Sequence, residues 1–223
     1  MCTITFFLKT IIDFYKRFGY LQKKNTNSFY IFPTTKEEVI DVIDDLDCSK
    51  SNGPHSIPTD IFKFIKLIVS ESLSIIINLS FSTGVFIDNL KVSKIIPIYK
   101  GKGSNMSYCN YRPISLLSNR DKVIEKLMFK RLYCFLTKYK VFYNLQFGFR
   151  ENHSTTHALI YLTEEIRKAL DKNLFSCGVF VDLQKAFDTV DHDILLFKLD
   201  HYGVRGVENN WFKSYLSNRK QYG

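Results

Sequence analysis

An acidic side chain, Asp182, comes directly after a short apolar run in this sequence. Magnesium prefers hard oxygen ligands, and one or two carboxylates usually hold it together with substrate phosphates. A pair of such ions can clamp the attacking and leaving oxygens of a phosphoryl transfer. The position of Asp182 therefore suggests a metal ligand. The alternative, for an isolated aspartate, is that it only ends a strand and caps the following turn.

The element that would position Asp182 is a strand predicted over residues 175–183. Alternation along this strand puts Phe180 and Asp182 on one face and the aliphatic side chains on the other. If the aliphatic face packs on helices, Asp182 faces a cleft. Two short helices, at about 192–201 and 208–216, are expected after it.

Helices and a hairpin are predicted upstream of that strand. Thr34 and Glu37 have capping-box spacing, and a buried helical face follows them. Pro58 is placed to begin a second helix that runs to about Leu79, with Gly84 as a plausible stop. Residues 92–99 and 111–117 read as two paired strands around a basic turn. A long apolar-faced helix follows, and then a helix capped by Ser154 with Ala158, Leu162, Ile166 and Leu170 in register. The predicted helices and strands are mixed along the chain without strict alternation, which indicates the α+β class.

The composition restricts the type of protein. The chain has 223 residues, 45% of them hydrophobic, which is enough to bury a core. A net charge of +9, spread along the whole length, favours polyanions, first nucleic acid and second an anionic membrane surface. Five scattered cysteines favour reduced thiols inside a cell over a disulfide framework or a zinc site.

Targeting signals are not evident. The apolar segment 1–8 is short and lacks a small-residue cleavage site, so it does not read as a signal peptide. No apolar run reaches the roughly 20 residues that a membrane span needs. We therefore expect an intracellular protein of the nucleus or cytoplasm that is not secreted and has no membrane partner.

Several segments together resemble one family, the reverse transcriptase domain of non-LTR retrotransposons, with the closest similarity to the jockey-like branch of LINE elements. The resemblance covers about residues 34–222, and residues 1–33 remain unassigned. Its motifs, in the order of the family, are Ser-Asn-Gly-Pro at 51–54 with Ile-Pro at 57–58, Ile-Pro-Ile-Tyr-Lys at 96–100, Asn-Tyr-Arg-Pro-Ile-Ser-Leu-Leu-Ser at 110–118, Gln-Phe-Gly-Phe-Arg at 146–150 with Ser-Thr at 154–155, and Phe-Val-Asp-Leu-Gln-Lys-Ala-Phe-Asp at 180–188.

The resemblance implies a partial right-hand polymerase fold. Residues 34–170 would be the fingers and residues 171–223 the beginning of the palm. In the family, the aspartate at the place of Asp182 binds both magnesium ions, and the backbone carbonyl at the place of Leu183 assists. The aromatic residue at the place of Phe187 lies beneath the sugar of the incoming nucleotide and favours deoxynucleotides. Asp188 resembles a structural acid that caps the turn.

The resemblance also assigns nucleotide and template contacts. Arg112 would contact the triphosphate, for which a planar guanidinium fork is well suited. Lys100 would assist it, although the turn leaves Lys102 as an alternative, and either lysine could simply be a solvated turn residue. Residues matching a loop near the template strand are Gln146, Gly148 and Arg150, and Gly148 would allow close backbone approach.

The function implied is RNA-directed DNA synthesis, in which deoxynucleotide triphosphates are added to a DNA primer on an RNA template with Mg²⁺. The printed sequence contains neither the Gly-x-Pro-Gln-Gly nor the Ala-Asp-Asp motif that the family carries after Asp182. Because Ala-Asp-Asp supplies the other metal aspartates, we expect this chain to be a fragment that is inactive by itself. The alternative is a non-catalytic basic remnant that binds RNA or single-stranded DNA, which would suit the positive charge and the many aromatic residues.

Overall fold

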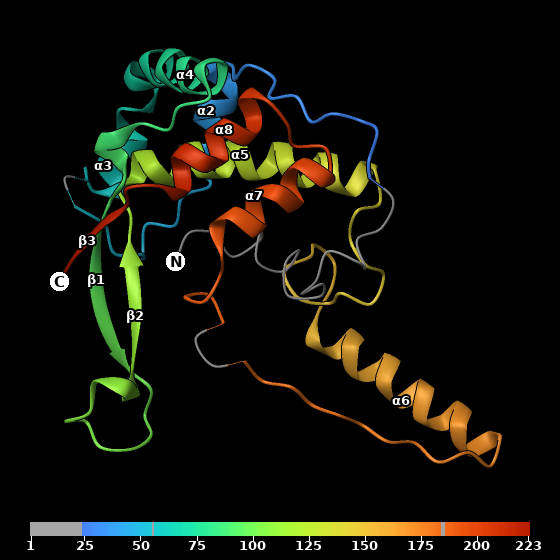
Figure 1. The fold of residues 1–223 in the computed structure, drawn as a ribbon. Coiled ribbons are helices and arrows are strands. Elements are labelled where there is room, and N and C mark those ends of the chain that lie inside the picture. Colours follow the sequence, from blue (N-terminus) through green and yellow to red (C-terminus); the bar gives the residue numbers. More distant parts are fainter. Residues whose placement is uncertain (1–23, 55, 184–185) are drawn as a thin grey trace.

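The computed structural model describes residues 24–54, 56–183 and 186–223 (Figure 1). The expectations for residues 1–23, including the absence of a signal peptide, and for positions 184–185 of the last motif lie outside the described residues. The helices are α2 (Lys36–Asp44), α3 (Thr59–Phe64), α4 (Lys66–Thr83), α5 (Asn119–Lys138), α6 (Thr155–Asp171), α7 (His192–His201) and α8 (Val207–Leu216). The strands are β1 (Val92–Tyr99), β2 (Tyr111–Leu116) and β3 (Lys220–Tyr222), and short 3₁₀ turns precede β1 and β2.

One three-stranded sheet has the order β2-β1-β3. The predicted hairpin is confirmed: β1 pairs antiparallel with β2, from Lys94 opposite Leu116 to Tyr99 opposite Tyr111. The short strand β3 was not predicted and lies parallel to β1 on its other side. The mixed α+β class is therefore confirmed.

The core lies where α2, α4, α5, α7 and α8 meet, and the β1–β2 hairpin projects away from these helices (Figure 1). Trp211 and Tyr215 of α8 are completely buried and stack with ring planes 5° apart. The indole nitrogen of Trp211 donates to Ser80 Oγ at 3.0 Å. Side chains of α8 and α4 are therefore joined by both packing and hydrogen bonding, although about 130 residues separate them in sequence.

The start of α2 lies close to its predicted place. Thr35, rather than Thr34, is the N-cap, and its hydroxyl accepts from the backbone N–H of Glu38 at 3.2 Å. The Thr34 hydroxyl instead donates to the Glu38 carboxylate at 3.0 Å, which draws the preceding chain onto the helix. The predicted apolar face is confirmed, because Val39 and Ile43 are fully buried.

The second predicted helix is interrupted. Ile65, with φ −91° and ψ 8°, separates α3 from α4, and this break allows Phe62 of α3 and Ile77 and Phe81 of α4 to reach the same core. The predicted stop is confirmed: Gly84 has φ +68°, and its N–H donates to the carbonyl of Ser80. That left-handed conformation favours glycine, and an added Cβ would also lie 2.7 Å from the carbonyl oxygen of Val207.

The strand predicted over residues 175–183 is not formed, and that prediction is wrong. The segment is extended and exposed, with no strand beside it among the described residues. An apolar sequence alone does not make a strand, because its N–H and C=O groups need the backbone of a neighbour. Phe175 and Phe180 are consequently almost fully exposed.

Helix α6 has its predicted cap but not its predicted packing. The Ser154 hydroxyl accepts from the N–H of His157 at 3.3 Å, yet no residue of α6 is buried. Leu162, Ile166 and Leu170, expected on a packed face, are 39, 41 and 65% exposed. Figure 1 shows α6 and the segment after it extending away from the core. The core thus joins residues on both sides of position 170 and leaves α6 outside it.

Candidate nucleotide and metal site

The basic residues of the hairpin lie near its tip. Arg112 pairs with Ile98 in the sheet and is exposed. Lys100 follows β1 by one residue, and its ammonium donates to the carbonyl of Cys109 across the turn at 2.7 Å. Because Lys100 is two positions beyond Ile98, it lies on the same side of the ribbon as Arg112. Lys102 is exposed in the turn itself.

The loop expected near a template is fixed by its own contacts. Gln146 donates to the carbonyl of Gly148 at 3.2 Å. Arg150 donates to the carbonyl of Tyr143 at 3.1 Å, and its guanidinium lies 5.4 Å from the ring centre of Phe142. These contacts of Arg150 hold the loop in place. An added Cβ on Gly148 would meet no atom of the described residues within 4 Å.

Phe187 lies beside that loop. Its ring and that of Phe149 meet edge to face with centroids 6.4 Å apart. Phe187 is half-buried and belongs to a turn over residues 186–189 that leads to α7. The structure therefore brings together two segments that sequence analysis assigned to the template and the nucleotide sugar.

Asp182 and Leu183 lie in the extended segment described above, and both are exposed. In Figure 1 this segment lies apart from the tip of the β1–β2 hairpin, the element to which Arg112 belongs. Within the described ranges, no cluster of three or more His, Cys, Asp or Glu side chains could hold a metal ion.

A buried acidic cluster at the start of α5 was not anticipated. Asp121 and Glu125 are 1% and 3% exposed. Burial raises the pKa of Asp121 to about 7, and the nearby charge of Glu125 adds to this, while hydrogen bonds from Ser118 oppose it. Tyr215 donates to Glu125 at 2.8 Å, and Arg219 lies 4.0 Å from the same oxygen. The capping-box spacing of Ser118 and Asp121 is the signal that could have located this cluster.

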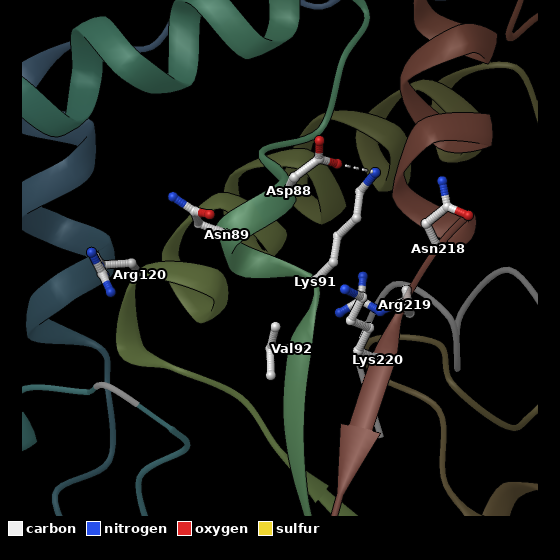
Figure 2. Close-up of a pocket in the computed structure, with 8 residues that line it drawn as sticks. All are labelled: Asp88, Asn89, Lys91, Val92, Arg120, Asn218, Arg219 and Lys220. Carbon is white, nitrogen blue, oxygen red and sulfur yellow. Dashed lines mark ion pairs between the residues drawn. The ribbon is translucent and has the colours of Figure 1, made fainter.

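A basic pocket, also missed, opens where β1 begins and α8 ends (Figure 2). Its volume is about 820 Å³, and its charged lining consists of Asp88, Lys91, Arg120, Arg219 and Lys220. The adjacent basic residues in the run Asn-Arg-Lys at 218–220 could have indicated part of this basic surface. Nothing in the sequence indicated that this run would lie beside Lys91, because β3 was not predicted.

No helix in the described part of the chain is long and apolar enough to cross a membrane.

Comparison with known proteins gives a consistent result. Residues 100–223 match the family model described as "Reverse transcriptase (RNA-dependent DNA polymerase)". The chain is 34% identical over 199 residues to the "Probable RNA-directed DNA polymerase from transposon BS" of Drosophila melanogaster, covering 86% of this chain and 21% of that protein. It is 30% identical over 179 residues to the "RNA-directed DNA polymerase from mobile element jockey" of the same species, covering 80% of this chain and 20% of that protein. The chain thus spans about a fifth of the length of these relatives.

Proposed function

Since this chain belongs to the reverse transcriptase (RNA-dependent DNA polymerase) family, we propose that it carries part of the nucleotidyl-transfer site of an RNA-directed DNA polymerase from a non-LTR retrotransposon. The observation that carries the proposal is the family match over residues 100–223, which includes every residue assigned to the site. On this proposal, residues 34–170 are the fingers of a right-hand polymerase and residues 171–223 begin its palm.

The proposed substrates are an RNA template, a DNA primer and deoxynucleotide triphosphates. Arg112 would bind the triphosphate through its planar fork of donors. The ammonium of Lys100 has three donors and uses one on the Cys109 carbonyl, so two are left for phosphate oxygens. The ring of Phe187 would lie beneath the sugar and exclude a 2′-hydroxyl.

The template strand would pass the loop that contains Gln146, Gly148 and Arg150. The open space at Gly148 supports a close approach of nucleic acid there. Arg150 would act mainly by holding the loop, because its guanidinium is engaged with Tyr143 and Phe142.

The donor chemistry at Asp182 and Leu183 fits magnesium, since a carboxylate and a backbone carbonyl are hard oxygen ligands and both residues are exposed. When bound, the metal would neutralise charge on the transferred phosphoryl group. Asp182 would hold it, and the carbonyl of Leu183 would assist.

A chimaera tests this proposal. Residues 100–223 would replace the matching segment of the Drosophila melanogaster jockey polymerase, and deoxynucleotide incorporation would be measured on a primed RNA template with Mg²⁺. We expect incorporation that Asp182→Asn lowers by at least about 100-fold, because the metal loses a charged ligand. Asp193→Asn is the matched control, since Asp193 is an exposed aspartate on α7 outside the proposed site.

Equal activity of the Asp182→Asn and Asp193→Asn chimaeras would contradict the metal role of Asp182. A chimaera that binds the primed template but incorporates nothing would favour the non-catalytic binding protein, for which the net charge of +9 is the supporting observation.

A further inference from the structure

The basic pocket beside β1 has a strong imbalance of charge. Lys91, Arg120, Arg219 and Lys220 line it, and among the described residues Asp88 is the only acidic one in its lining. Figure 2 shows Arg219 and Lys220 reaching it from the segment after α8, with Arg120 on the other side of β1. Charges of one sign that converge on a concave surface attract the opposite charge more strongly than the same charges dispersed.

Lys91 contributes a cation that is already withdrawn from water. Its side chain is only 6% exposed, and its ammonium lies 2.8 Å from the carboxylate of Asp88. Asp88 is itself 86% exposed, so water weakens the compensation that it provides. The interior end of the pocket therefore keeps a positive potential.

Arg219 is held rigidly at the pocket wall. Its guanidinium lies 4.6 Å from the ring centre of Tyr215 and 5.8 Å from that of Phe86. One of its nitrogens donates to the carbonyl of Tyr215 at 3.1 Å. An arginine fixed in this way loses little conformational freedom when it binds an anion through its remaining donors.

We propose that this pocket binds the phosphodiester backbone of a single-stranded nucleic acid, at a site separate from Asp182 and from the hairpin tip. Four cations suit phosphate groups. No aromatic side chain of the described residues lines the pocket, so it offers no platform on which a base could stack. The pocket therefore recognises the charged backbone and not a particular nucleotide. This inference rests on the proposed function, because it supplies a further contact for the polymerase's nucleic acid.

The test uses the full chain and a fluorescently labelled oligouridylate, with binding followed by anisotropy across a range of salt. The pocket variant is Arg120→Gln/Lys220→Gln, in which both altered side chains are exposed. Because each lost phosphate contact on a single strand lowers the salt slope by about 0.7, we expect the slope of log K against log salt to fall by about 1.4. Because the two lines converge near about 1 M salt, the affinity at about 50 mM should be roughly 60-fold lower than that of the wild type.

The matched control is Lys172→Gln/Lys213→Gln, which removes the same charge from exposed lysines outside the pocket and should leave the slope unchanged. An oligonucleotide with a neutral methylphosphonate backbone should bind the wild type and the pocket variant equally weakly. Inorganic phosphate at matched ionic strength should not displace the oligouridylate. Equal slopes for the two double variants, or displacement by inorganic phosphate, would overturn the proposal. Neither result depends on the incorporation assay, so the pocket and the polymerase function can fail separately.

Discussion

The two carboxyl oxygens of Asp121, at the start of α5, have different surroundings. One oxygen, Oδ2, accepts from the Ser118 N–H at 3.1 Å and from the Ser118 hydroxyl at 2.9 Å, which closes the capping box. The other oxygen, Oδ1, is buried and has no hydrogen-bond partner among the described residues. The cap thus favours an ionised Asp121, whereas burial and the charge of Glu125 disfavour it, and burial is the larger effect.

A pH-dependent stability follows from this carboxyl group. The pKa of Asp121 is raised in the folded protein from 3.8 to about 7, so the protonated form is the one that folding favours. The stabilisation is complete below pH 3.8 and is lost progressively as the pH rises to about 7. The loss can reach about 4 kcal/mol, taking about 1.4 kcal/mol for each pKa unit.

Asp121→Asn should remove this pH dependence of stability, while its amide oxygen can still accept the hydrogen bonds from Ser118. Urea unfolding of wild type and variant, at about pH 5 and about pH 8, measures the effect. The wild type should lose stability relative to the variant at the higher pH. Parallel behaviour of the two proteins would show that Asp121 is already ionised at about pH 5 in the folded state.

Gly53, in the Ser-Asn-Gly-Pro motif, gives a second prediction for a single residue. Its N–H donates to the carbonyl of Leu117 at 3.1 Å, and an added Cβ would lie 2.7 Å from the backbone nitrogen of Ser118. Gly53→Ala should therefore lower the free energy of unfolding by about 1–3 kcal/mol. The control is Gly148→Ala, where an added Cβ meets no described atom within 4 Å and where a change within about 0.5 kcal/mol is expected. Equal effects in urea titrations would mean that Gly53 is free to move away from Leu117.

Among the elements, α8 and α6 differ in what they contribute to stability. Trp211 of α8 is fully buried between the rings of Phe81, Phe86 and Tyr215. Leu170 of α6 is 65% exposed. Both residues are large and apolar, so only their surroundings distinguish them.

Trp211→Ala should cost about 3–5 kcal/mol of unfolding free energy, because it leaves a cavity and removes the hydrogen bond that the indole donates to Ser80. Leu170→Ala should change the unfolding free energy by about 0.5 kcal/mol or less. Denaturant titrations of the two variants give the comparison. A large loss in Leu170→Ala would show that α6 packs on the rest of the chain in solution.

Local chemistry determines which elements the sequence could reveal. The helix caps near Thr34 and at Ser154, the stop at Gly84 and the β1–β2 hairpin depend on neighbouring residues, and each is found at or near its predicted position. The pairing of β3 with β1 depends on residues far apart in sequence, and it could not be predicted. The strand predicted over residues 175–183 was wrong for the same reason: a strand depends on hydrogen bonds to a neighbouring strand, which its own apolar residues do not supply.

At the scale of the molecule, the site residues fall into separate groups. The basic residues Lys100 and Arg112 share the hairpin tip, and Phe187 meets the loop that contains Gly148 through Phe149. Asp182 belongs to neither group, since its segment pairs with no strand in the described part of the chain. Motif order in the sequence led to the proposal of these residues but could not give the distances between them, because distances depend on the packing of whole elements. The basic pocket was missed for the same reason.

The burial of Trp211 against α4 also bears on how this chain folds as it is made. Trp211 and Ser80, which its indole nitrogen contacts, are 131 positions apart. At a synthesis rate of roughly 5–20 residues per second, the ribosome needs about 7–26 s to add the residues between them. Throughout that interval the apolar surfaces of α2 and α4 have no α8 to cover them, and a chaperone that binds nascent chains can reach them. Completion of the core is therefore timed by translation, and it waits until α8 has left the ribosomal tunnel.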